Sequence, residues 1–261
     1  MKTTIKIFLC IAALALTWGC SSDDDDIMTS APFISSQAPQ WAIDWTWNDP
    51  EPDWKEPAST QYECRMELLV ALDENLLKLF SDDDQMAIFI NGTCRGVSFP
   101  NVSQTTGNVY FLIHIKGSSQ EAGTDMELRY HCHNARQIFT NKYLPVFTPN
   151  NLMDDAYQLV FSPIGNSSKY PLYTQLSVSI PETVPFTVTK DDKLAVFVGD
   201  ECRGILHTSA EDYFRWSSVV VSREENETAT IRYYSAEKQG IYTIAEGVSL
   251  NNDLQLVNAR F

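Results

Sequence analysis

The sequence predicts an all-β protein built from two tandem antiparallel β-sandwich modules, and three observations support this fold class. Segment 83–96, DDQMAIFINGTCRG, returns 108 residues later as DDKLAVFVGDECRG. Apolar residues in both copies form short alternating or continuous runs that end at turn residues, as β-strands do. The one helix-like run, residues 73–80, is short.

The repeat extends beyond this core on both sides. Upstream, Tyr62 matches Tyr170 at the same spacing of 108 residues. Downstream the spacing falls to 103 residues, where IFT at 138–140 meets IYT at 241–243. Aligned ends with a changing spacing between them are expected when a domain is duplicated and its loops then change length. We therefore predict an internal duplication.

The predicted boundary between the two modules lies in the turn-rich stretch 162–168. The first β-sandwich module is expected at 39–163 and the second at 164–261. An apolar strand at 157–161 lies next to this boundary. It either closes the first sandwich or opens the second.

Each copy of the repeat core predicts a β-hairpin, at 86–98 and at 194–206. The dipeptides at 91–92 (NG) and 199–200 (GD) supply residues that tolerate the positive φ of a two-residue turn. Further strands are expected at 109–115, 127–133, 158–161, 219–222, 230–234 and 254–257.

A tryptophan-rich lead-in precedes the first repeat. Residues 41–47, WAIDWTW, place Trp or Ile at every second position, which predicts a strand with one aromatic face. We expect this face to belong to a core or to an inter-domain contact.

The amino terminus has the features of an export signal. Lys2 and Lys6 precede an apolar stretch at 7–18 that is too short to span a membrane. The sequence around Gly19-Cys20 resembles the lipobox of bacterial lipoproteins. This resemblance implies a signal peptide at 1–19 and a lipidated Cys20, through which the protein would be anchored in a membrane.

Residues 20–38 are expected to form a disordered tether, because the acidic run SSDDDD at 21–26 cannot bury surface. This run resembles the export signal of surface lipoproteins in the Bacteroidota, and the alternative is a plain spacer. The repeat core, with Ala-x-Phe followed by Cys-Arg-Gly, also resembles a module of secreted and surface proteins of that phylum. These resemblances imply an outer-membrane lipoprotein that faces the cell exterior. They imply no activity.

The charge of the chain excludes one class of partner. The formal net charge is −15, and loss of Lys2 and Lys6 with the signal peptide would make it −17. Nucleic-acid binding needs clusters of Lys and Arg, and none is present. No second apolar stretch is long enough to span a bilayer, so the lipid would be the only membrane attachment.

Motifs of catalysis, cofactor binding and metal binding are missing from the sequence. It contains no Gly-x-Ser-x-Gly, no His-Glu-x-x-His and no P-loop. His131 and His133 would share one face of a strand, but the second copy has Tyr234 and Ala236 there, which favours two histidines at a solvent edge over a metal site. The run 82–84 lacks the spacing of a calcium loop. We expect no enzyme and no cofactor.

The cysteines of the two modules are expected to differ in role. Cys94 and Cys202 are equivalent, but Cys64 and Cys132 have no cysteine counterpart in the second copy. A structural disulfide at Cys94 or Cys202 should have a duplicated partner, so both are expected to be small buried apolar residues. A bridge that uses Cys64 or Cys132 stays open.

Four residues are candidates for ligand contact. Arg95 and Arg203 either pair with the aspartates at 83–84 and 191–192 or clamp a ligand, and their duplication favours the structural role. Trp54 lies in a Pro-rich loop and either stacks on a sugar or partner or folds back as a plug; Trp216 is weighed in the same way.

The expected function is a non-catalytic binding module for a glycan or a surface protein. The alternative is a structural, assembly or adhesion accessory. A polysaccharide hydrolase is less favoured.

Overall fold

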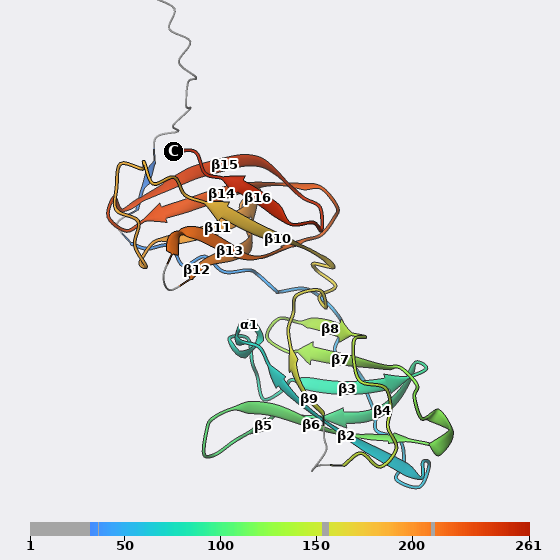
Figure 1. Cartoon of the computed structure of the whole chain (residues 1–261). Helices are drawn as coiled ribbons and strands as arrows, with labels where there is room; N and C mark the ends of the chain where they lie inside the picture. Colours follow the sequence, from blue (N-terminus) through green and yellow to red (C-terminus); the bar gives the residue numbers. More distant parts are fainter. Residues whose placement is uncertain (1–31, 36, 153–156, 210–211) are drawn as a thin grey trace, which may run out of the picture.

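The computed structural model describes residues 32–35, 37–152, 157–209 and 212–261, and it confirms the all-β class (Figure 1). The expected signal peptide, Cys20 and most of the expected tether at 20–38 lie outside these residues. The last part of the expected tether contains the short strand β1 (Phe33–Ile34). The first module contains β2 (Cys64–Leu72), α1 (Glu74–Leu77), β3 (Gln85–Ile90), β4 (Thr93–Ser98), β5 (Asn101–Val102), β6 (Val109–Gly117), the 3-10 turn η1 (Ser119–Glu121), β7 (Met126–Cys132), β8 (Gln137–Asn141) and β9 (Tyr157–Phe161). The second contains β10 (Leu172–Ser179), β11 (Lys193–Val198), β12 (Glu201–Ser209), β13 (Asp212–Ser222), β14 (Glu227–Ser235), β15 (Gly240–Leu250) and β16 (Gln255–Asn258).

Two four-stranded sheets form the first sandwich, in the orders β5-β6-β2-β9 and β4-β3-β7-β8. The second module has one continuous sheet, β1-β15-β14-β11-β12-β13-β10-β16, which folds over on itself along β12. The first part of β12 pairs with β11 and its last part pairs with β13. In the first module Pro100 follows β4 at the corresponding position, and its missing N–H separates β4 from β5.

The strand pairings are the same in both modules. β2 pairs antiparallel with β6 and parallel with β9, and β10 pairs antiparallel with β13 and parallel with β16. The strand β9 therefore closes the first sandwich, which resolves the alternative left open for residues 157–161. One parallel pair in each module is thus an exception to the otherwise antiparallel pairing of the predicted sandwiches.

The core of each sandwich follows from the alternation of its strands. In β2 every second residue from Cys64 to Leu72 is buried, and these side chains meet those of β3, β6 and β7. A second core lies between the two halves of the folded sheet. The predicted helix at 73–80 shrinks to α1, which Asp73 caps by accepting hydrogen bonds from the N–H groups of Asn75 and Leu76.

The glycine of Cys-Arg-Gly marks a close approach between strands. A Cβ on Gly96 would lie 2.5 Å from the backbone oxygen of His114, and one on Gly204 would lie 2.9 Å from a methyl carbon of Val220. The strands β4 and β12 thus run past β6 and β13 too closely for any side chain, which explains why glycine occurs at this position in both copies.

The lead-in forms no strand over 41–47, so the prediction from its alternation is wrong. Its three tryptophans separate: Trp45 is buried in the first core, Trp41 is half-buried, and Trp47 is exposed. The segment pairs with the modules only at isolated points, for example Trp47 N–H with the carbonyl of Ala135. Figure 1 shows it running from the second sandwich to the first.

A cluster of charges joins the modules. The buried Lys169 ammonium lies 3.0 Å from Asp44 in the lead-in and 3.3 Å from Glu201 on β12. Glu201 also accepts a hydrogen bond from the Tyr170 hydroxyl and pairs with Arg223 at 2.9 Å. These contacts connect the lead-in and the linker to the second module.

Candidate functional site

The paired arginines are structural. Arg95 donates two hydrogen bonds to Glu121, at 3.2 and 2.5 Å, and Arg203 donates two to Glu227, at 3.0 and 3.2 Å. Both guanidinium groups are buried. The expected partners at 83–84 and 191–192 are therefore wrong. Burial acts to raise the pKa of Glu121, but the Ser118 N–H and the Arg95 guanidinium outweigh it and hold that pKa below its usual range. Neither arginine is presented to a ligand.

The second aspartate of the acidic pair at the start of each repeat accepts hydrogen bonds from a tyrosine hydroxyl and a backbone N–H group. Buried Asp84 accepts hydrogen bonds from the Tyr130 hydroxyl at 2.6 Å and the His133 N–H at 2.8 Å. Asp192 repeats this with Tyr233 and the N–H of Ala236. Burial raises the pKa of Asp84 despite these donors. Within the described ranges no group of three or more His, Cys, Asp and Glu side chains is placed to hold a metal ion.

Trp54 folds back onto the first module. Its ring packs edge-on against Phe89 with 6.1 Å between centroids, and the Arg129 guanidinium lies 4.1 Å from the same Phe89 ring. Trp41 and Arg232 make the matching contacts with Phe197 in the second module. Two lead-in tryptophans therefore cover equivalent outer faces, and Trp54 has the plug role that the sequence left as one alternative.

Trp216 takes the structural role, one of the two alternatives that the sequence left open for it. It is buried in the second core, and its indole N–H donates to the carbonyl of Tyr213 at 2.8 Å. His131 is buried as well, and burial lowers its pKa. The expectation of two histidines at a solvent edge is therefore wrong for His131.

The four cysteines of the described residues are free thiols. Burial raises the pKa of Cys202 and of Cys132 to about 11, so both are protonated at neutral pH and poor nucleophiles. Cys94 is only half-buried, contrary to expectation, and lies near the backbone of Lys55.

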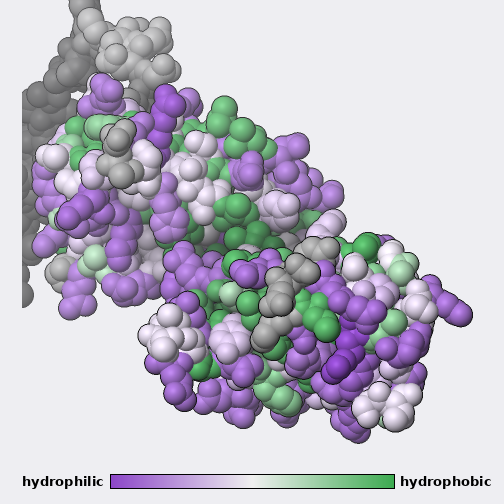
Figure 2. Space-filling model, turned by 60° about the horizontal axis from the view of Figure 1, so that its bottom comes forward, coloured by the Kyte–Doolittle hydropathy of each residue, from purple (hydrophilic) through white to green (hydrophobic). Residues whose placement is uncertain are grey.

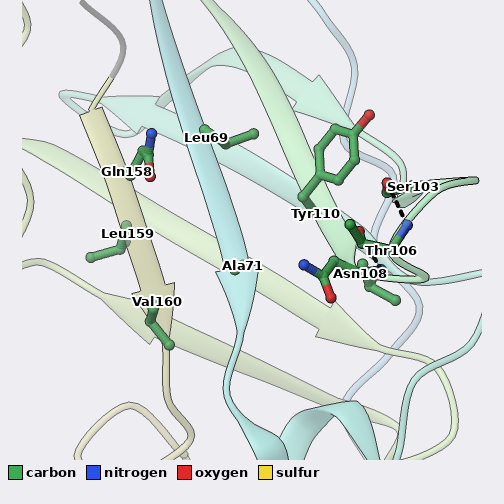
Figure 3. A pocket seen from close by; sticks show the side chains of 10 residues that line it. Leu69, Ala71, Ser103, Thr106, Asn108, Tyr110, Gln158, Leu159 and Val160 are labelled. Carbon is green, nitrogen blue, oxygen red and sulfur yellow. Dashed lines mark hydrogen bonds between the residues drawn. The ribbon is translucent and has the colours of Figure 1, made fainter.

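A hollow of about 390 Å³ lies on the outer face of the first sandwich, and we call it the outer groove. Its lining consists of Leu69, Ala71, Ser103, Thr106, Asn108, Val109, Tyr110, Gln158, Leu159 and Val160. Figure 3 shows the floor on β2 between β6, which carries Tyr110, and the edge strand β9. No lining residue carries a charge.

Polar groups at the rim of the outer groove are free to bind a ligand. The Tyr110 hydroxyl and the side-chain amides of Asn108 and Gln158 make no hydrogen bond within the described part of the chain. Apolar surface lies between them, and Val160 is 66% exposed. Figure 2 shows such apolar patches among polar surface on both modules. An apolar hollow with a few convergent polar groups is the usual composition of a small-ligand site.

The second module shows that the fold does not require this apolar face. On β10, Ser177 and Ser179 occupy the places that Leu69 and Ala71 occupy on β2, in the same register with the neighbouring strand. Arg215 stands opposite Ser179 where Tyr110 stands opposite Ala71. The central strand of this sheet therefore forms with serines in place of Leu69 and Ala71, although Leu256 on the edge strand β16, opposite Ser177, is 75% exposed.

The sequence contained a signal for this groove that the prediction did not use. Residues 68–72 read LLVAL and residues 176–180 read LSVSI. Both copies have the buried positions apolar, and only the first also has apolar residues at the outward positions. The difference between two repeats, and not their likeness, marked the site.

No protein-family model matches the chain, and no curated protein matches it. Function must therefore be inferred from its own residues. Among the described residues, no helix has the length and apolar character needed to cross a membrane.

Proposed function

We propose that this protein is a non-catalytic, glycan-binding lipoprotein, anchored by lipid on Cys20 to the outer membrane and facing the cell exterior. The outer groove of the first module is its binding site, and the ligand is an uncharged sugar chain. The observation that carries this proposal is the uncharged hollow of the first module, in which the Tyr110 hydroxyl and the side-chain amides of Asn108 and Gln158 form no hydrogen bond within the described residues.

The lining suits the chemistry of a sugar. Sugar rings have an apolar C–H face that packs on aromatic and aliphatic side chains, and Tyr110, Leu69 and Ala71 supply such a surface. The hydroxyl groups of a sugar both donate and accept hydrogen bonds. The side-chain amides of Asn108 and Gln158 can likewise donate and accept at the same time. The absence of charge in the lining favours a neutral glycan, because a charged ligand would lose its hydration without a partner.

Tyr110→Ala is expected to remove binding on a glycan array, because it deletes the stacking surface and one hydroxyl of the site. Leu69→Ser, which installs the second-module residue, should weaken binding about tenfold through loss of apolar contact. The control is Trp54→Ala, which alters an aromatic ring on the opposite sheet and should bind like the unmodified chain.

An array on which no glycan is bound would contradict the proposal. The uncharged edge of β9 would then be tested as a strand-pairing site for a protein partner, by pull-down from the cell envelope. Equal loss of binding in the Tyr110 and Trp54 variants would also contradict the assigned site.

Deletion of the acidic run Asp23–Asp26 is expected to leave the protein in the membrane but to hide it from protease added outside the cell. The reason is the resemblance of this run to a surface-export signal. Replacement of the run by four serines keeps its length but removes its charge, so this variant tests whether surface export depends on the acidic side chains or on the length of the segment. Unchanged digestion of both variants would show that the run is a plain spacer.

A further inference from the structure

A second cavity, of about 360 Å³, lies where the lead-in meets the second module, and we call it the cationic pocket. Residues 39–41 of the lead-in form one side. Lys190 comes from the turn before β11, Lys193 is the first residue of β11, and β12 contributes His207. Trp216 on β13 also belongs to the lining. The Trp41 ring, half-buried against Phe197, belongs to the same lining.

The basic side chains of the cationic pocket have no acidic partner among the residues that the structure describes. Lys190 and His207 are exposed and form no ion pair there. The Lys193 ammonium donates one hydrogen bond, to the carbonyl of Pro39 at 2.8 Å, and keeps two N–H groups. These groups are clustered although the whole chain has a net charge of −15.

Asp192 is the one carboxylate among the described lining residues of the cationic pocket, and its oxygens are engaged by hydrogen-bond donors. Asp192 is buried, and its oxygens accept hydrogen bonds from Thr189, Tyr233 and the N–H of Ala236. All these donors belong to the second module, so Asp192 does not neutralise the pocket through a direct contact with its lysines.

The first module again shows that these residues are not needed for folding. At the spacing of the repeat, Asp82, Gln85 and Phe99 stand where Lys190, Lys193 and His207 stand in the second module. The strands around them pair in the same way. The basic groups are therefore a property of this pocket and not of the sandwich.

We propose that the cationic pocket binds an acidic sugar unit, with the anionic group on Lys190, Lys193 and His207 and the sugar ring against Trp41. The shared chemistry is a carboxylate or a sulfate on a saccharide, for which lysine and histidine N–H groups provide charge-assisted hydrogen bonds. This site is separate from the outer groove and does not depend on it. A chain with both sites would bind a neutral segment and an acidic unit independently.

The test is titration calorimetry on the full chain in mild detergent, with oligogalacturonate as the carboxylate probe, its methyl ester as the neutral match, and a sulfated galactan oligomer as the sulfate probe. We expect an acidic oligomer to bind, the ester to bind at least about tenfold more weakly, and added salt to weaken acid binding. Whichever acidic probe binds more tightly identifies the anion.

Variants locate the site. Lys190→Gln and His207→Gln are each expected to weaken acid binding about tenfold, since each removes one charge-assisted contact, and both positions are exposed enough to leave the melting temperature unchanged. The matched control is Lys78→Gln, an exposed lysine of the first module. Tyr110→Ala should bind the acid normally, which separates this site from the outer groove. The inference is overturned if neither acidic probe binds, if the ester binds equally well, or if Lys78→Gln weakens binding as much as Lys190→Gln.

Discussion

Arg203→Ala is expected to lower the free energy of unfolding of the second module by about 3–5 kcal/mol, because it removes one partner of a buried ion pair. The guanidinium, whose side chain is 2% exposed, holds the Glu227 carboxylate at 3.0 Å and lies 3.3 Å from Glu201. Without it, Glu227 remains largely buried as an uncompensated charge, and the Tyr170 ring loses the cation 4.9 Å from its centroid. Urea unfolding followed by circular dichroism measures this loss.

Two controls separate charge from geometry. Arg203→Lys keeps a cation but not the two-pronged contact with Glu227, so its loss should be smaller than that of the alanine variant. Arg215→Ala removes an arginine that is 80% exposed on the same module, and it should change stability by less than about 1 kcal/mol. An Arg203→Ala loss no larger than that of Arg215→Ala would contradict the structural role.

The equivalence of the modules extends the expectation to Arg95. Its contacts with Glu121 and with the Tyr62 ring match those of Arg203, and its guanidinium is similarly buried. We expect the instability of Arg95→Ala to appear in the first module, whose core contains the buried Trp45 as a fluorescent reporter of unfolding. Together the two variants test whether the arginine of Cys-Arg-Gly stabilises both modules through the same kind of buried ion pair.

Local features of the sequence predicted much of the fold. The hairpin turns at 91–92 and 199–200 were identified from residue type alone, because few residues accept positive φ, and Asn91 and Gly199 adopt it. The alternation in β2 and β10 likewise follows directly from one buried face. These features need only neighbours along the chain, which is why one sequence sufficed.

Contacts between distant segments were harder to predict from the sequence. The partners of Arg95 and Arg203 lie 26 and 24 residues further on, at spacings that the variable loops set, so the repeat could not identify them. The strand predicted at residues 41–47 of the lead-in is wrong for a similar reason. In its period-two pattern, Trp41 packs on Phe197 and Trp45 packs on Tyr170, whereas Trp47 is exposed. These side chains do not share one buried face, and the segment pairs with no neighbouring strand in the described residues.

Neither proposed binding site was found by matching the repeats. The strand β9 had to be placed beside β2 before Val160 and Tyr110 could be recognised on one face. The cationic pocket needed the lead-in to be placed against β11 and β12. In both cases the residues that matter are those where the modules differ, since the shared ones are already explained by turns, ion pairs and cores.

Cys20→Ala is expected to change the location of the protein from membrane to soluble fraction almost completely. A diacylglycerol on the cysteine sulfur would contribute about 0.8 kcal/mol for each buried CH₂ of two acyl chains, far more than any surface contact. A chain with a net charge of −15 is repelled by anionic lipid, so apart from the lipid only the apolar stretch at 7–18, while it remains uncleaved, favours the membrane. Fractionation with an antibody, together with incorporation of labelled palmitate, measures both anchoring and acylation.

The control for Cys20→Ala is Cys94→Ala, which removes a half-buried thiol from the first module and should leave location and label unchanged. An uncleaved apolar stretch at 7–18 could itself retain the Cys20 variant, so a second variant replaces residues 1–20 with a cleavable secretory signal. Since the lipid is the proposed anchor, this chain should be secreted free of membranes. If it still sediments with the outer membrane and carries no palmitate, the two modules themselves bind the envelope, and the lipoprotein interpretation is wrong.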